Sequence, residues 1–228
     1  HLPVGVDAMI AEALVARVAA ALPEGLPATF LPVQEVCKSD EHIAFPGTLT
    51  LDWETTIRGF LETGASVARA GVRKLVIVTS HGGNVAPMGV VARELRIAHG
   101  LMAVTTAWGT GADIADLLPQ GEAEYGIHGG ASETAQMLAI RPDLVAMERA
   151  EDFRTAQLSH IARFGQLRLH GPTATGWMTG DLHPAGAAGN AAAATREAGE
   201  EILRRHAAAF LELLHEVAEA DPPSRSDP

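Results

Sequence analysis

The sequence predicts one α/β domain built around parallel strands, and three observations indicate it. The chain has 228 residues, about one and a half times the ~150 residues of a typical domain, which indicates one domain with short additions. Hydrophobic residues make up 47% of the chain and aromatic residues only 4%, so Ala, Val, Leu and Ile must fill the core. Residues 74–107 read as strand, glycine-rich loop, helix and strand, the pattern of a βαβ unit with two parallel strands.

The first part of the chain is predicted to hold a helix, a strand and a polar loop. The helix begins at Asp7, which would act as its N-cap, and ends before Pro23. Its apolar residues recur at every fourth position: Ile10, Leu14, Val18 and Leu22. Residues 28–36 mix apolar and β-branched side chains and are predicted to form a strand. Residues 38–42 are polar and are predicted to form a loop.

The middle of the chain contains the clearest elements. They are a helix over 51–70, a strand over 74–79, a helix over 85–99 and a strand over 101–107. The first of these strands is a continuous apolar run, as expected of a strand covered on both faces. Ser80–Asn84 follow it directly, so His81 is expected at the carboxyl edge of the sheet, where α/β proteins place their sites.

The last part of the chain is predicted to contain helices over 133–140 and 191–217. Connections are expected over the acidic residues 113–124 and over the glycine-rich residues 126–130. A third, over residues 165–190, could contain a short strand or hairpin. Residues 221–228 are predicted to be a disordered tail.

The charge balance excludes several classes of partner. The net charge is −11, which disfavours nucleic acid and anionic membranes because both need a concentrated positive surface. No apolar run is long enough for a membrane span. A single cysteine, Cys37, excludes a disulfide framework and fits a cytoplasmic protein. A small-molecule substrate is therefore expected.

Three polar clusters stand out as candidates for chemistry. They are Asp7 at a helix start, His81 after a buried strand, and His128 with Glu133 around the second glycine-rich loop. Each has a purely structural interpretation: Asp7 as a cap, His81 bonded to a loop backbone, and Glu133 placed in a first helical turn. The turn at Gly82–Asn84, before a helix N-terminus, would also suit a phosphate.

Together, these residue types favour metal chemistry. Imidazole and carboxylate are the ligand set of zinc, manganese and iron, and one carboxylate can bridge two ions. A nearby histidine that is not a ligand could protonate a leaving nitrogen. Five other histidines lie in unclustered helical or polar contexts and are interpreted as ordinary residues: His99, His160, His170, His206 and His215. A Walker loop, a dinucleotide-binding glycine motif and a serine nucleophile elbow are all absent from the sequence.

Five motifs in order resemble those of the creatininase (creatinine amidohydrolase) family. They are His1-Leu2-Pro3 with Asp7, Glu41 to Leu49 (EHIAFPGTL), Ser80 to Asn84 (SHGGN), His128 to Thr134 (HGGASET), and Asp181 to Pro184 with Gly186. The resemblance implies a layered α/β sandwich with a mostly parallel central sheet and a centre of two divalent ions (Zn, Mn or Fe). It also implies hydrolysis of a small non-peptide amide, in a homo-oligomer such as a hexamer.

The resemblance also implies roles for individual residues. Asp7 matches the carboxylate that bridges the two metals, His81 a metal-binding histidine, and Glu133 a metal ligand or its immediate neighbour. His128 matches the histidine that moves protons. Three residues match positions that line the site: Glu41, His42 and Asn84. Trp108 lies in a loop-like stretch and is expected either to line a pocket over the substrate or to serve an interface.

Two departures from the family pattern qualify these expectations. Family members carry Glu-Gln-His-Gly, with two metal ligands, before the His-Leu-Pro motif, and this sequence begins after that point. The domain, expected over residues 1–220, would then lack its first strand and that motif. Creatinine-hydrolysing members also carry acidic residues where this chain has Gly83 and Ile127. A substrate other than creatinine is therefore favoured, and metal ligation shifts to Glu133.

The leading hypothesis is a metal-dependent amidohydrolase in which a metal-bridging hydroxide attacks a cyclic amide, lactam or formamide and His128 protonates the leaving nitrogen. A formamide deformylase and a peptidase acting on a modified peptide in cofactor maturation are the nearest variants. Two alternatives come from other classes: a non-catalytic small-ligand binding or assembly module with a degenerate metal site, and a phosphate-binding α/β protein.

Overall fold

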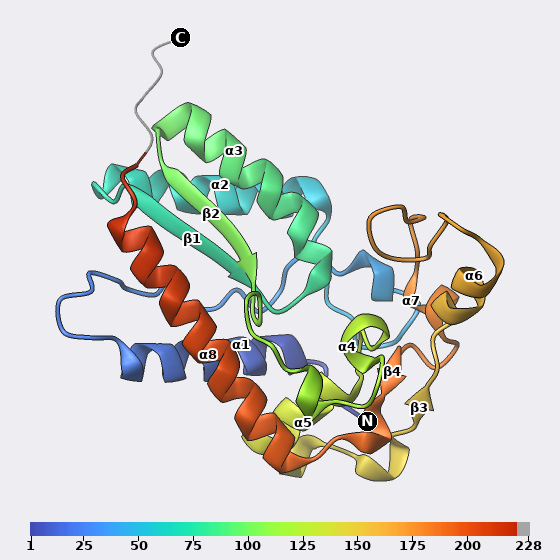
Figure 1. The fold of residues 1–228 in the computed structure, drawn as a ribbon. Helices are drawn as coiled ribbons and strands as arrows, with labels where there is room; N and C mark the ends of the chain where they lie inside the picture. The colour runs from blue at the N-terminus through green and yellow to red at the C-terminus, as the bar shows by residue number, and fades with distance from the viewer. Residues whose placement is uncertain (223–228) are drawn as a thin grey trace.

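The computed structural model describes residues 1–222, which form a layered α/β fold with a small side lobe (Figure 1). Its helices are α1 (Val6–Ala21), α2 (Trp53–Arg69), α3 (Val85–His99), α4 (Glu122–Tyr125), α5 (Ala131–Ile140), α6 (Gln157–Arg163), α7 (Thr179–Leu182) and α8 (Arg196–Glu219). Its strands are β1 (Lys74–Thr79), β2 (Met102–Ala107), β3 (Asp152–Phe153) and β4 (Gly189–Asn190).

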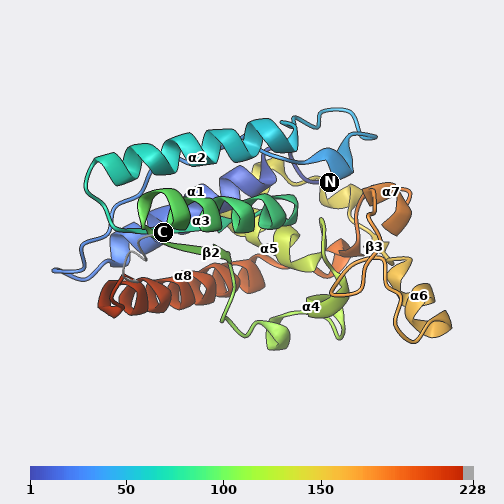
Figure 2. The ribbon, with the colours of Figure 1, turned by 90° about the horizontal axis from the view of Figure 1, so that it is seen from above.

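The central sheet is the pair β1–β2, and it confirms the predicted βαβ unit. The strands run parallel, from Lys74 opposite Met102 to Thr79 opposite Ala107, and α3 connects them. Helices α2 and α3 lie on one side of this sheet and α1 and α8 on the other (Figures 1 and 2). Because parallel strands joined by a crossover end at the same edge, the loops after Thr79 and Ala107 start side by side.

Two apolar clusters hold the layers together. The first lies between α3 and the sheet and joins Val91, Leu95 and Leu101 to side chains of α2 and β1. The second joins α1, α5 and α8 through Ile10, Leu14, Met137 and Leu203. The apolar residues predicted for the first helix, Ile10, Leu14 and Val18, are buried.

The strand predicted over residues 28–36 is wrong, because this segment has no regular structure. Pro32 lacks the N–H that a ladder requires, and Leu31, which a buried strand would cover, is 54% exposed. The expectation that Asp7 caps the first helix is also wrong. Gly5 occupies the N-cap position, and Asp7 lies inside the first turn without capping it.

The last third of the chain differs from the prediction in detail. Helices α6 and α7 were not expected, and the strand expected within 165–190 is the short β4, paired antiparallel with β3. The last helix begins at Arg196 and not at 191, because the Thr195 hydroxyl accepts the N–H of Ala198 and caps it. The tail predicted over 221–228 lies outside the described residues from position 223 onward. Within residues 1–222, no helix combines the length and the apolar character of a membrane span.

The contact between α8 and α5 depends on Gly199. A Cβ at this position would lie 1.8 Å from the carbonyl oxygen of Ala135 in α5. That atom belongs to a helix backbone and cannot move aside as a side-chain end can. The two helices therefore approach each other at a distance that only glycine permits, and α5 carries Glu133 toward the site.

Gly199→Ala is expected to destabilise the fold by about 1–3 kcal/mol, because overpacking forces α5 and α8 apart. Gly89→Ala in α3 is the matched control, since a Cβ there meets nothing within 4 Å and alanine favours a helix over glycine by up to about 1 kcal/mol. Urea unfolding measures both. Equal stability of the two variants would contradict this account of the α5–α8 contact.

Candidate functional site

The carboxyl end of β1 positions the first site residue, His81. The Thr79 hydroxyl accepts the backbone N–H of His81 and donates to the backbone carbonyl of the same residue, both at 3.0 Å. These bonds define the turn between β1 and α3. The imidazole therefore leaves the sheet at the edge that the sequence predicted.

A polar loop packs against this edge and brings two more side chains to it. The Asn84 side chain accepts the N–H of Lys38 at 3.2 Å and donates to the Thr79 hydroxyl at 3.4 Å. It thereby fastens the loop to the end of β1. The loop then forms a 3-10 turn over Asp40–His42, which directs Glu41 and His42 toward His81. Asn84 is buried, so both ends of its amide serve this connection.

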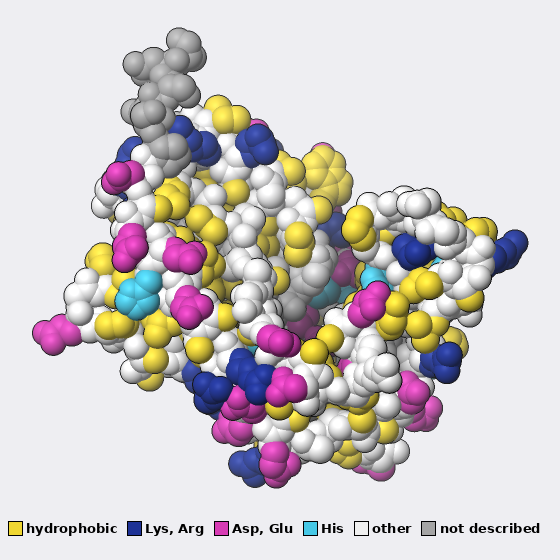
Figure 3. Space-filling view, viewed as in Figure 1, with side chains coloured by type: hydrophobic (Ala, Val, Ile, Leu, Met, Phe, Trp, Pro, Cys, Tyr) yellow, Lys and Arg dark blue, Asp and Glu magenta, His cyan; other side chains and the backbone are white. Residues whose placement is uncertain are grey.

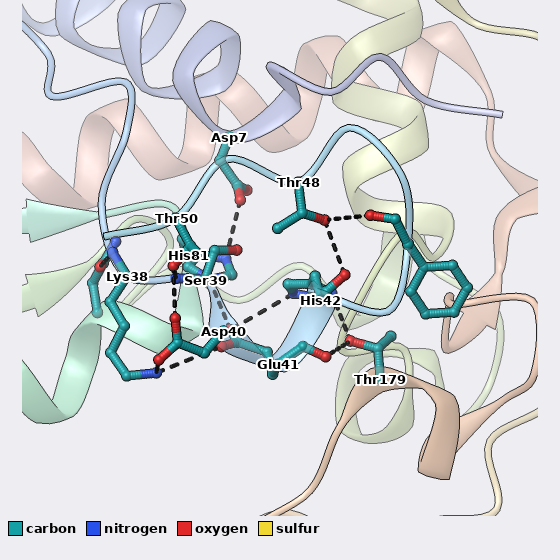
Figure 4. Close-up of polar contacts among 12 residues, drawn as sticks. Asp7, Lys38, Ser39, Asp40, Glu41, His42, Thr48, Thr50, His81 and Thr179 are labelled. Atoms are coloured by element: carbon teal, nitrogen blue, oxygen red, sulfur yellow. Dashed lines mark hydrogen bonds and ion pairs between the residues drawn. The ribbon is translucent and has the colours of Figure 1, made fainter. Parts of the chain in front are cut away.

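The imidazole of His81 lies between two carboxylates from distant parts of the chain (Figure 4). Its Nδ1 is 3.1 Å from Oδ2 of Asp7, in α1, and its Nε2 is 2.8 Å from Oε1 of Glu41. His42 adds a second imidazole, with Nε2 3.6 Å from the same Glu41 oxygen. In the space-filling view, histidine and acidic side chains gather in a hollow between the main body and the side lobe (Figure 3).

Mutual attraction controls the charges in this cluster. Burial opposes charge on His81, but the contacts with Asp7 and Glu41 outweigh it and raise the pKa of His81 to about 10. Burial likewise favours the neutral acid at Glu41, yet the contact with His81 lowers the pKa of Glu41 to about 2. Without a bound cation, the His81 imidazolium is the positive partner of two carboxylates.

The second glycine-rich loop brings His128 to the same place. The rings of His128 and His42 are 4.2 Å apart between centroids. The backbone of His128 exchanges two hydrogen bonds with Ala188, at 3.2 and 2.7 Å, which hold the loop against the segment before β4. Burial, and then the neighbouring His42, lower the pKa of His128 to about 4. His128 is therefore neutral at physiological pH.

Glu133 lies in the first turn of α5 and faces the same cluster. Its carboxylate accepts the N–H of Gly129. Burial, and then the negative charge of Asp7, raise the pKa of Glu133. Burial is the larger of the two causes, so Glu133 ionises less readily here than in water, and a bound cation would favour its charged form.

Glu122, a residue that the sequence analysis missed, holds this loop in shape. Its buried carboxylate accepts the N–H of Ala131 at 2.7 Å and the N–H of Asn190 at 2.9 Å. A Cβ at any of three glycines would lie within 2.5 Å of its Oε1: Gly126, Gly130 and Gly189. Gly126 and Gly130, on either side of His128, therefore make room for the Glu122 carboxylate. The spacing of these glycines around an acidic residue was the signal in the sequence from which the role of Glu122 could have been predicted.

Trp108, expected either to line a pocket over the substrate or to serve an interface, packs against helix α8. Its ring lies 4.5 Å from that of Phe210 in α8, between centroids, and it contacts the cluster of α1, α5 and α8. It lines a separate cavity of about 370 Å³ together with His206 and Glu122. The packing of Trp108 therefore supports a role in the core.

The residues present at the site fit a divalent cation. Among the described residues, Glu41, His42 and His81 offer ligand atoms that all lie within 4.8 Å of one another. The His81 Nε2 is buried and makes no aligned hydrogen bond, although a Glu41 oxygen is 2.8 Å away. Mixed nitrogen and oxygen donors of this kind suit Zn²⁺, Mn²⁺ or Fe²⁺.

Comparisons with known proteins agree with the motifs. The family model described as creatinine amidohydrolase (Creatininase) matches residues 1–214. A creatinine amidohydrolase of Pseudomonas putida is 34% identical over 169 residues, which are 67% of this chain and 63% of that protein. A mycofactocin precursor peptide peptidase of Mycobacterium ulcerans is 31% identical over 208 residues, which are 89% of this chain and 74% of that protein.

Solved structures show the same fold. A creatinine amidohydrolase crystal structure superposes with a TM-score of 0.75 at 27% identity and covers 97% of this chain and 86% of its own. A manganese creatininase superposes with a TM-score of 0.73 at 26% identity, and a creatininase variant of the Zn-Zn type with 0.73 at 27%. Each covers 96% of this chain and 86% of its own. The layered α/β sandwich expected from the resemblance is therefore confirmed.

Glu122→Gln is expected to destabilise the fold by about 1–3 kcal/mol, because its amide cannot accept both N–H groups and leaves one buried donor unpaired. Glu124→Gln, an exposed change on the same short helix, is the matched control and should stay within about 0.5 kcal/mol of the wild type. Denaturant titration measures the difference. A Glu122→Gln variant as stable as the control would show that this carboxylate does not hold the loop.

Proposed function

Because the chain belongs to the creatinine amidohydrolase (creatininase) family, we propose that it is a metal-dependent hydrolase that cleaves the carbon–nitrogen bond of a small non-peptide amide. One observation carries the proposal: the cluster around His81, which is suited to a metal, lies next to His128, a histidine that is neutral at physiological pH. We place the catalytic domain over residues 1–220, supported by the family match over 1–214.

Asp7, His81 and Glu133 are the residues that would hold the metal. They come from α1, the end of β1 and the first turn of α5, so three separate elements fix the site. A bound divalent ion would polarise the substrate carbonyl and lower the pKa of a water molecule. The ion would replace the His81 imidazolium as the positive partner of the carboxylates, leaving a neutral His81 free to act as a ligand.

His128 is the residue that moves protons. Since it is neutral, it can accept a proton from the attacking water and then donate that proton to the leaving nitrogen. Its imidazole is half-buried and lies beside that of His42. The hydrogen bonds with Ala188 fix the backbone of His128, so the imidazole is held in place for both transfers.

The substrate we propose is a cyclic amide, a lactam or a formamide. Gly83 and Ile127 stand where creatinine-hydrolysing relatives carry acidic residues, which disfavours creatinine. A modified peptide is the second candidate, because the peptide peptidase from Mycobacterium ulcerans matches 89% of this chain, a larger share than the Pseudomonas putida enzyme. Both substrates present a carbon–nitrogen bond to the same cluster.

His128→Asn is expected to lower kcat by about 10²–10⁴-fold with little change in KM, because it removes proton transfer and leaves the metal ligands in place. His215→Asn, at an exposed position on α8, should retain full activity. The assay measures amine or formate release from a panel of lactams, formamides and short peptides, with Zn²⁺ or Mn²⁺ added and then chelated.

Chelation should abolish turnover, and added metal should restore it. Full activity of the His128→Asn variant would refute the role of His128. A chain that binds metal but turns over no member of the panel would favour a binding or assembly module instead.

A further inference from the structure

We propose that Glu41 and His42 are themselves metal ligands that act with His81, although the family resemblance assigns them only to the wall of the site. The inference rests on the proposed function, because it concerns the same metal centre. Four observations support it: the position of the Glu41 carboxylate, the missing side chain at Gly83, the bond between Thr179 and His42, and the charge around Lys38.

The Glu41 carboxylate approaches His81 as a second ligand would. Its Oε1 lies 2.8 Å from Nε2 of His81, and the side chain is only 12% exposed. The geometry is nevertheless not that of a hydrogen bond, since the buried Nε2 has no aligned partner. A carboxylate oxygen and an imidazole nitrogen that converge without an aligned hydrogen bond can become neighbours around one cation once the imidazolium has lost its proton.

Gly83 explains how Glu41 reaches this place. A Cβ at position 83 would lie 2.4 Å from Oε1 of Glu41 and 2.7 Å from Nε2 of His81. The Glu41 carboxylate therefore occupies the space in which a side chain at position 83 would begin. Gly83 does not have a positive φ, so the need for glycine here is steric. The acidic group missing at position 83 is supplied from the 3-10 turn at Asp40–His42.

Thr179 sets the tautomer of His42. The Thr179 side chain is fully buried, and its hydroxyl donates to the carbonyl oxygen of Glu41 at 2.9 Å. A hydroxyl has one proton. With that proton assigned to the Glu41 carbonyl, the contact with Nδ1 of His42 is donated by the histidine. The proton of neutral His42 is thus on Nδ1, and the lone pair is on Nε2. That atom lies 3.6 Å from Oε1 of Glu41 and is available to a metal.

Lys38 leaves the correct oxygen of Glu41 free. Its Nζ lies 3.9 Å from Oε2 of Glu41 and 3.3 Å from Asp40. The ammonium group therefore attracts Oε2, and not the Oε1 atom that lies next to His81. Oε1 faces the two imidazoles, and the ligand atoms of Glu41, His42 and His81 all lie within 4.8 Å of one another.

The test is Zn²⁺ binding by isothermal titration calorimetry, with Co²⁺ absorption as a spectroscopic readout, on the full chain and five variants. Glu41→Gln should weaken Zn²⁺ binding by at least about 100-fold. This loss exceeds the about 10–100-fold loss of affinity expected when the residue removed only hydrogen-bonds to a metal ligand. Gly83→Ala should weaken it at least about 10-fold, because the new Cβ displaces the carboxylate. Gly82→Ala, where a Cβ meets nothing within 4 Å, is the matched control and should bind as the wild type does.

Thr179→Val tests the His42 ligand through its tautomer. It should weaken Zn²⁺ binding by about 10–100-fold and change the Co²⁺ spectrum. The fifth variant, Thr179→Ser, should restore both because it keeps the hydroxyl. Nitrogen NMR of the metal-free protein should find the His42 proton on Nδ1 in the wild type and in Thr179→Ser, but not in Thr179→Val.

The outcomes separate the inference from the proposed function. A wild-type chain that binds Zn²⁺ while Glu41→Gln and Gly83→Ala bind equally well would overturn the inference and leave the proposed function standing. A wild-type chain that binds no Zn²⁺, Co²⁺ or Mn²⁺ would overturn both. A His42 proton on Nε2 in the wild type would refute the assignment of His42 as a ligand.

Discussion

The imidazole of His81, held between the carboxylates of Asp7 and Glu41, is the interaction on which the rest of the site depends. It connects the start of α1, the loop before α2 and the end of β1, which are far apart in the sequence. Since a buried carboxylate without a positive partner costs several kcal/mol, this arrangement is stable only while His81 carries a proton or a metal replaces it. A structural ion cluster and a metal centre are thus two states of one geometry.

Most of the layered core could be predicted because its signals are local. The run Lys74–Thr79 and the helix over 85–99 follow from apolar patterning alone, and the structure places both within the predicted limits. The segment 28–36 has the composition of a strand, but a strand exists only if a neighbour pairs with it. The helices α6 and α7 are too short for a helical periodicity to be visible in the sequence.

The site could be predicted as a set of residues but not as a geometry. Motifs indicated Asp7, His81, His128 and Glu133, and these side chains do converge. Glu122 and Thr179 were missed because each acts through partners more than 50 positions away along the chain, Asn190 and His42. Asn84 was expected to line the site, and in the structure its amide holds Lys38. In each case, competition between partners in the folded chain decided the role.

The central claim is that this cluster is built to hold a metal, and stoichiometry tests it most directly. The chain would be dialysed against Zn²⁺ or Mn²⁺ and its metal content measured by plasma mass spectrometry, alongside His81→Gln. The account predicts a saturable, stoichiometric content in the wild type and its loss in the variant. Equal content in the two proteins, or none in either, would contradict it.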